Sequence, residues 1–276
     1  MRKLAFVLLV LALPVAAHAA DCRYSAPRDA NLDAIGLQNL VLKLGASDLD
    51  IQGVAGLNQV QVRGTACAST AAALESLQVG AKRDGASAAV VVPNDHGFNI
   101  GSLFGSRYAY LKLQVRVPAT LAIRIESGSA DVKAQQLAAL NFSTGSGDLV
   151  ASGIAGALTL KLGSGDVNAQ QVGSVDLLST GSGDVKVDGV NGDVRTGNSG
   201  SGDLSFSHVK GSVSVGSTGS GDIALGQIGH DVEVGSTGSG DVTANDVGGA
   251  FSVRSTGSGD IRHNGVKGKV SVPADD

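Results

Sequence analysis

A short acidic motif, Gly-Ser-Gly-Asp, recurs through the second half of the chain and is the pattern best suited to chemistry. After a degenerate first copy at Asp131, its carboxylates follow at intervals of 17 to 19 residues, at Asp148, Asp166, Asp184, Asp203, Asp222, Asp241 and Asp260. Carboxylates in a row can bind calcium, which prefers carboxylate and carbonyl oxygens. They can also accept hydrogen bonds from backbone N–H groups of a glycine-rich turn. We favour the turn, because the calcium-binding repeat recurs every nine residues and separates its aspartate from the aliphatic residue.

Other chemical constellations are not found in the sequence. His208, His230 and His263 fall at different positions of the repeat, so they do not form a metal-binding column. No Gly-x-Ser-x-Gly elbow occurs, and no Walker lysine follows a Gly-Ser-Gly motif. We therefore expect no catalytic residue and no cofactor. A glycan-processing β-helix enzyme stays an alternative, which would need a break in the repeat with basic residues clustered on one face.

The residues around each aspartate predict the elements that position it. With the aspartate as position 0, positions 1 and 6 are aliphatic in every copy, and position 3 is mostly small or apolar. Alternation with a period of 2 indicates β-strands, because successive side chains point to opposite faces. Each repeat therefore predicts two short strands joined by glycine-rich turns. Stacked repeats would bury the aliphatic residues in columns, so the fold class is an all-β parallel β-solenoid with 18 to 19 residues per coil.

The same alternation predicts where the recurring aspartates, serines and threonines of the repeat lie. The aspartates should lie at the turn about 4.8 Å apart, where each neighbouring pair would repel by roughly 0.9 kcal/mol in water. Ser217, Ser236 and Ser255 continue the inward phase and should form a buried ladder. Thr218, Thr237 and Thr256 should then face the solvent.

The first half of the chain carries a looser version of the repeat. Asp48–Gly56 matches positions 0 to 8, and Val60 and Val62 would supply the second strand of that coil. Ser69–Leu77 is rich in alanine and predicts a short helix. Further strands are expected at 77–82, 88–92, 108–117 and 121–125. We expect a β region with a capping segment and first coils at 20–130, the regular solenoid at 131–276, and one continuous domain containing both.

The N-terminus resembles a secretory signal peptide. Arg2 and Lys3 precede an apolar run at 4–15, and Ala17-His18-Ala19 provides small residues before a cleavage site after Ala19. A signal peptide at 1–19 predicts a periplasmic or secreted protein, and no further apolar run would anchor the mature chain. In an oxidising compartment the only two cysteines, Cys22 and Cys67, are expected to form a disulfide.

Composition narrows the classes of partner. The formal net charge is −4, which disfavours nucleic-acid binding because that needs a basic face. Aromatic residues make up only 3% of the chain, so a conventional apolar ligand pocket is not expected. The glycine-rich segment 96–107 carries Phe98 and Phe104, the pair that we expect to contact a specific partner, such as a cell-surface glycan or an envelope protein.

Tandem Ser-Thr-Gly-Ser-Gly-Asp-Val coils behind a signal peptide and a cysteine-bearing segment resemble the bacterial putative-adhesin β-strand-repeat family of unknown function. That family is related to the head domains of putative autotransporter adhesins. The resemblance spans Asp21 to Val272. It implies a right-handed β-solenoid, a location in the envelope or at the surface, and an adhesive or scaffolding role, with no catalytic residues to carry over.

Overall fold

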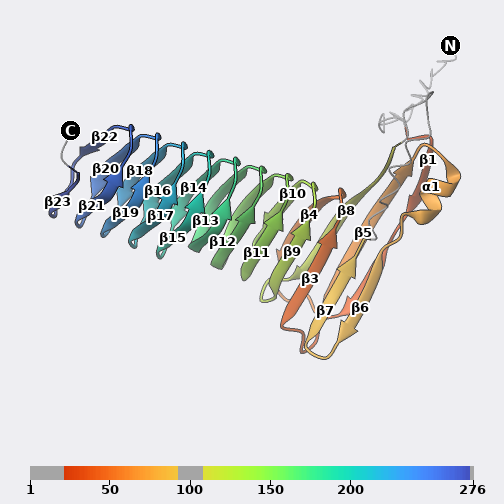
Figure 1. Cartoon of the computed structure of the whole chain (residues 1–276). Helices are drawn as coiled ribbons and strands as arrows, with labels where there is room; N and C mark the ends of the chain where they lie inside the picture. The colour runs from red at the N-terminus through yellow and green to blue at the C-terminus, as the bar shows by residue number, and fades with distance from the viewer. Residues whose placement is uncertain (1–21, 93–107, 274–276) are drawn as a thin grey trace, which may run out of the picture.

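A computed structural model describes residues 22–92 and 108–273. These residues form β-strands and one short helix, and the strands stack as successive coils of a β-solenoid (Figure 1). Neighbouring coils of the repeat region pair in parallel and in register, as Leu204↔Ile223 and Ile223↔Val242 do. The predicted fold class is confirmed.

All strands are connected in one hydrogen-bonded sheet that folds into two opposite layers, which we call sheet 1 and sheet 2, and each coil gives one strand to each layer. Sheet 1 consists, in stacking order, of β4 (Asp48–Val54), β10 (Val132–Gln135), the first parts of β12 (Leu149–Leu162) and β13 (Val167–Thr180), β14 (Val185–Val190), β16 (Leu204–Val209), β18 (Ile223–Ile228), β20 (Val242–Val247) and β22 (Ile261–Asn264). Sheet 2 consists of β3 (Asn39–Leu44), β9 (Ala122–Ser127), β11 (Ala139–Thr144), the last parts of β12 and β13, β15 (Val194–Ser199), β17 (Val213–Thr218), β19 (Val232–Thr237), β21 (Phe251–Thr256) and β23 (Val270–Ser271).

The core lies between the two sheets as columns of apolar side chains. Positions 1, 3 and 6 point inward, and in the coil that starts at Asp222 they are Ile223, Leu225 and Ile228, each at most 2% exposed. Burial of one such side chain stabilises the fold by about 1.5–3 kcal/mol. Because no single coil can bury its own apolar face, the stack is the unit that folds.

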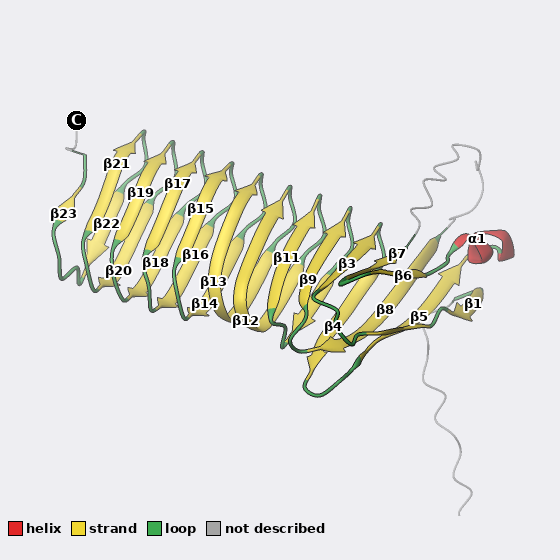
Figure 2. Cartoon of the chain, turned by 90° about the horizontal axis from the view of Figure 1, so that it is seen from below, coloured by secondary structure: helices red, strands yellow, loops and turns green. Residues whose placement is uncertain are grey.

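Two rows of turns join the sheets along the edges of the stack (Figure 2). The first row, which we call the aspartate edge, contains the Gly-Ser-Gly-Asp motifs and leads from sheet 2 into sheet 1. The second row follows position 5, where the backbone takes the left-handed conformation in every coil of the repeat region from 131 onward, including non-glycine residues such as His208 (φ 52°) and Gln227 (φ 56°). That conformation costs a side chain roughly 1–2 kcal/mol, so its recurrence reflects the bend that each coil needs at this edge.

The N-terminal coils are stacked out of sequence order. The coil made of β3 and β4 lies between β7 (Ser87–Val91) with β8 (Ala109–Pro118) on one side and β9 with β10 on the other, although it precedes all four in the chain. Beyond β8 the pairing turns antiparallel, through β5 (Gln59–Ala68) and then β1 (Tyr24–Pro27) and β2 (Ala30–Asp33). β6 (Gly80–Asp84) pairs antiparallel with β7.

The expected place of Val60 and Val62 is therefore wrong. Both are buried, but they lie on β5, which extends sheet 1 next to β8 and does not form the second strand of the β4 coil. The strand that completes that coil is β3, which comes before the aspartate in the chain, as in every later coil. The apolar alternation alone could not reveal on which side of the aspartate the partner strand lies.

The predicted helix is present as α1 (Ala71–Ser76). It begins where Thr70 caps it, with the Thr70 hydroxyl accepting a hydrogen bond from the Ala73 N–H at 3.2 Å. Within the described residues, no helix is long and apolar enough to cross a membrane.

Candidate functional site

The motif aspartates form a hydrogen-bonded ladder along the aspartate edge. The Oδ1 atom of each carboxylate accepts the backbone N–H of the equivalent aspartate one coil later, as between Asp203 and the N–H of Asp222 at 2.8 Å. The same contact runs from Asp131 to the last motif aspartate at 2.8–3.1 Å. A bond from a charged acceptor contributes more than a neutral one, so this ladder offsets repulsion between neighbouring carboxylates.

The donor differs from the one expected from the sequence. The turn interpretation predicts that each carboxylate accepts N–H groups of its own Gly-Ser-Gly turn, whereas the N–H comes from the next coil. The ladder therefore ties coils together rather than closing individual turns. Within the described residues, no group of three or more metal-ligating side chains converges on a common point.

Arg262 closes the ladder at its C-terminal end. Its guanidinium contacts the carboxylates of both Asp241 (2.7 Å) and Asp260. The N–H of Asp260, and then Arg262, lower the pKa of the Asp241 carboxyl below its ordinary value. Asp241 in turn raises the pKa of Arg262.

The glycines of the motif allow the coils to approach at this edge. A Cβ on Gly202 would lie 2.0 Å from the carbonyl oxygen of Gly183, and one on Gly221 would lie 2.1 Å from that of Gly202. Any side chain directly before the aspartate therefore clashes with the backbone of the preceding coil. The degenerate first copy has Ala130 at this position and neighbours the irregular β3–β4 coil.

The expected orientation of the serine and threonine columns is wrong. Thr218 and Thr237 are buried, at 4% and 5% exposure, whereas Ser217 and Ser236 are half-buried and Ser255 is exposed. The alternation shifts at Gly216 and Gly235, where two successive residues face outward before the threonine turns in. Two hydroxyls of this column brace their turns: that of the buried Thr180 donates to the Gly183 carbonyl at 3.0 Å, and that of the half-buried Thr256 donates to the Gly259 carbonyl at 3.1 Å. The buried hydroxyls of Thr196 and Thr218 have no hydrogen-bond partner within the described residues.

The same shift creates a groove on the outer surface of sheet 2. It lies over β17, β19 and β21, and Gly216 and Gly235 are among the residues that line it. We call this hollow of about 470 Å³ the serine groove, lined by Ser214, Val215, Gly216, Ser217, Glu233, Gly235, Ser236, Arg254 and Ser255. Hydroxyls recur along it with the coil spacing of about 4.8 Å, and an ion pair between Arg254 and Glu233 (3.1 Å) adds both charges.

A second hollow of about 480 Å³ lies near the N-terminal coils. Its lining includes the ion pair of Lys43 and Glu126 (3.5 Å) and the last described residues before the gap, Val91 and Val92. The serine groove is the better candidate, because equivalent hydroxyls recur along it from coil to coil.

One histidine contacts an acid without forming a catalytic triad. His208 Nδ1 and the Ser207 hydroxyl both lie 2.6 Å from Oδ1 of Asp188. These hydrogen bonds, first that of Ser207 and then that of His208, lower the pKa of the Asp188 carboxyl. The serine hydroxyl points to the carboxylate and not to the imidazole, so the histidine is not placed to take its proton.

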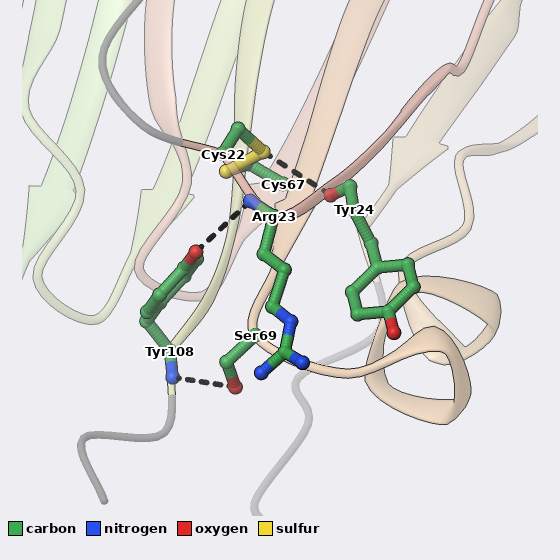
Figure 3. Close-up of a disulfide and its surroundings, with 6 residues drawn as sticks. All are labelled: Cys22, Arg23, Tyr24, Cys67, Ser69 and Tyr108. Atoms are coloured by element: carbon green, nitrogen blue, oxygen red, sulfur yellow. Dashed lines mark hydrogen bonds between the residues drawn. A yellow bond between two sulfur atoms is a disulfide. The ribbon is translucent and has the colours of Figure 1, made fainter.

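Cys22 and Cys67 form a disulfide that attaches the N-terminus to β5 (Figure 3). Beside it, the Arg23 N–H donates to the Tyr108 hydroxyl at 3.1 Å, and the Tyr108 N–H donates to the Ser69 hydroxyl at 3.2 Å. The disulfide and these two hydrogen bonds together join three segments at the end of the stack that lies away from the regular coils. Phe98 and Phe104, the expected partner-binding pair, lie outside the described residues, as does the expected signal peptide.

Sequence reasoning missed the serine groove and the Arg262 clamp. The groove depends on where the alternation shifts, and glycine at position 13 of successive coils (Gly197, Gly216 and Gly235) is the one sequence signal that marks it. The contact of Arg262 with two carboxylates depends on tertiary structure, because Arg262 follows Asp260 by two residues but Asp241 by 21 residues.

The stacked coils with a carboxylate ladder define this protein as a β-solenoid of the Gly-Ser-Gly-Asp type. The family model of Toastrack DUF4097 matches residues 59–225. The chain belongs to this family.

Solved structures give similar matches at low identity. A putative cell adhesion protein from Clostridium sporogenes is 14% identical, with a TM-score of 0.31 over 91% of this chain and 100% of that chain. A putative adhesin from Bacteroides fragilis is 11% identical, with a TM-score of 0.34, and the match covers 91% of this chain and 98% of that chain. A putative adhesin from Parabacteroides distasonis is 11% identical, with a TM-score of 0.31, and the match covers 90% of this chain and 97% of that chain. No curated protein matches the chain.

Proposed function

We propose that this chain is an exported, non-enzymatic β-solenoid that works as an adhesin or envelope scaffold and binds extended surface polymers along its outer faces. The observation that carries the proposal is the serine groove, where equivalent polar groups recur in register from coil to coil. A ligand with its own short repeat can contact several coils in the same way, so that weak single contacts add.

Linear glycans are the ligand class that the groove fits best. Its lining offers the hydroxyls of Ser214 and Ser236 and the charges of Glu233 and Arg254. The Ser217 hydroxyl donates to Oδ1 of Asn198 at 2.8 Å, so its oxygen can accept from a ligand. Such groups can donate to and accept from sugar hydroxyls, whereas the groove has no aromatic ring for stacking. Contact through hydrogen bonds alone predicts modest affinity for each sugar and a dependence on chain length.

Export is supported by the expected signal peptide and by the disulfide between Cys22 and Cys67, because disulfides persist in oxidising compartments. An adhesive role agrees with the family resemblance drawn from the motifs. The proposed absence of catalysis rests on the equivalence of the acids along the aspartate edge, where the acids from Asp131 to Asp241 each have one oxygen engaged by a backbone N–H.

The test is binding of the purified chain, residues 20–276, to an array of bacterial and host surface glycans. We expect long linear glycans to bind better than their short fragments. Ser214→Trp would fill the groove and weaken binding at least about tenfold, the loss of roughly 1.4 kcal/mol. Ala224→Trp places the same ring on the exposed face of sheet 1 and should leave binding unchanged.

Two results would contradict the proposal. One is equal binding by the Ser214→Trp and Ala224→Trp proteins, which would exclude the groove. The other is shortening of a bound glycan during prolonged incubation with the native chain, which would show that the protein is an enzyme.

A further inference from the structure

The last coil of the solenoid, Asp260–Val272, leaves the end of the core uncovered within the described residues. Ile261, Val266 and Val270 are partly buried, and Val272 is 38% exposed. Their counterparts one coil earlier are at most 4% exposed: Val242, Val247, Phe251 and Val253. Within the described residues, the apolar layer of this coil, which stands at the end of the stack (Figure 1), is therefore less covered than that of the coil before it.

The backbone of the last coil also has hydrogen-bonding groups that its position leaves unused. In each earlier coil the N–H at position 1 donates to the carbonyl at position 0 of the following coil, as Val242 does to Asp260. The Ile261 N–H has no such acceptor among the described residues. Oδ1 of Asp260 likewise lacks the N–H that Oδ1 of Asp241 accepts. β22 is thus an open sheet edge, the kind of edge that pairs with another strand.

The two turns of the last coil carry opposite charges. Asp260 lies at the aspartate edge, whereas Lys267 and Lys269 follow β22 at the opposite edge. Arg262, in the middle of β22, is already paired with Asp241 and Asp260. A twofold rotation about an axis perpendicular to the sheets reverses the strand, so the basic turn of one copy meets the acidic turn of the other. This surface is therefore complementary in charge to itself.

We propose that the last coil binds the last coil of a second copy, end to end, with β22 antiparallel to its counterpart. Antiparallel pairing of β22 would continue sheet 1 from one copy into the other and cover Ile261 and Val266. Pro273, two residues after the end of β23, has no N–H to donate, so we assign the pairing between the copies to β22. The dimer would place its two serine grooves on either side of the seam, because β17, β19 and β21 precede the last coil, but the proposal does not depend on what those grooves bind.

The contact area of one coil is small, so we expect a weak dimer with Kd in the range of about 10–100 μM. Sedimentation equilibrium of residues 20–276 over a range of concentrations measures it directly. Reversing the basic turn in a Lys267→Glu/Lys269→Glu protein should weaken dimerisation about tenfold or more, because attraction between exposed charges is replaced by repulsion. Asp260→Lys should do the same from the opposite turn.

A mixture of these two variants provides the decisive arm. One has two acidic turns and the other two basic turns, so the mixture should form heterodimers although each variant alone is monomeric. Lys210→Glu is the control, because Lys210 holds the position of Lys267 in an internal coil and should leave the dimer unchanged. Circular dichroism spectra and melting temperatures establish that all variants fold.

Three outcomes would overturn the inference. The first is a native chain that remains a monomer at about 1 mM, the weakest binding that matters here. The second is a dimer that persists in both charge-reversed variants, which would place the interface elsewhere. The third is a mixture of the two variants that stays monomeric, which would exclude the complementary turns.

Discussion

The backbone N–H of Asp241 donates to Oδ1 of Asp222 at 2.8 Å, although the two residues are 19 positions apart in the chain. The side chain of one coil thus takes the place of a backbone acceptor for the next coil. The same contact recurs along the aspartate edge, so the acid of the motif links successive coils. This explains why an aspartate, whose short side chain holds its acceptor oxygen two bonds from Cβ, stands in every coil.

Two replacements of Asp222, an internal residue of the ladder, distinguish its role as a hydrogen-bond acceptor from the effect of its negative charge. Asp222→Ala removes the acceptor for the Asp241 N–H and should lower the free energy of unfolding by about 1 kcal/mol. Asp222→Asn keeps a side-chain oxygen and should retain most of that stability. Urea denaturation measures both variants. Equal destabilisation by alanine and asparagine would show that the carboxylate charge, and not the acceptor, is what matters.

Acid should weaken the solenoid. The pKa of Asp241 is lowered by the Asp260 N–H and by Arg262, and that of Asp193 by the Ser212 N–H and by Arg195. Groups whose folded pKa lies below the unfolded value stabilise the fold above the unfolded pKa, and this stabilisation is lost as the pH falls through the folded value. The urea midpoint should therefore fall once the pH drops below the ordinary carboxyl value of 3.8.

The comparison with an Arg262→Gln protein sharpens this test. Without the guanidinium, the pKa of Asp241 moves toward its ordinary value, so the loss of stability in acid should be smaller. A native midpoint that rises between pH 5 and pH 3 would contradict the account, because repulsion along the carboxylate column would then outweigh the hydrogen bonds.

Two glycines of neighbouring coils should respond oppositely to alanine. Gly202→Ala would place a Cβ 2.0 Å from the Gly183 carbonyl oxygen, whereas a Cβ on Gly226 meets nothing within 4 Å. We expect Gly202→Ala to cost at least about 3 kcal/mol by overpacking. Gly226→Ala should be neutral or stabilising by up to about 1 kcal/mol, because alanine restricts the unfolded chain. Thermal unfolding of the Gly202→Ala and Gly226→Ala proteins measures both effects. Similar stabilities of the two proteins would refute the close approach of the coils at Gly202.

The sequence predicts the repeating part of the fold well, because burial fixes the side chains at positions 1, 3 and 6. It fails where a strand bends. Thr218 is buried and Ser217 is not, because the alternation shifts at Gly216, and a strict period of 2 cannot anticipate this shift. The left-handed residues at position 5 include Gln171 and His208, whose types give no sign of the bend.

The candidate site was harder to predict than the fold. The acidic column is evident from the motif spacing, but its donor lies 19 residues away and depends on the register between coils. The stacking of β4 between β8 and β10 similarly depends on tertiary pairing that no local pattern encodes.

One buried hydroxyl offers a gain in stability. Within the described residues the hydroxyl of Thr196 has no hydrogen-bond partner, and its side chain pairs in register with Leu177 and Val215 of an aliphatic column. Thr196→Val should raise the free energy of unfolding by about 1 kcal/mol, since it removes an unsatisfied polar group and keeps the shape. Thr237→Val is the matched control, because it removes the hydrogen bond to Thr256 at 3.2 Å and should bring no gain. Equal effects of the two substitutions would disprove this explanation.

The central claim is that equivalent residues of successive coils stand in one line, because the ladder, the groove and the last coil all follow from it. Nitroxide labels on cysteines at positions 205 and 224, which pair in register, test it by electron paramagnetic resonance. We predict strong dipolar broadening for this pair, whose backbones lie about 4.8 Å apart. Labels at 205 and 214, closer in sequence but on opposite sheets, should show much weaker broadening. Stronger broadening for the second pair than for the first would contradict the account.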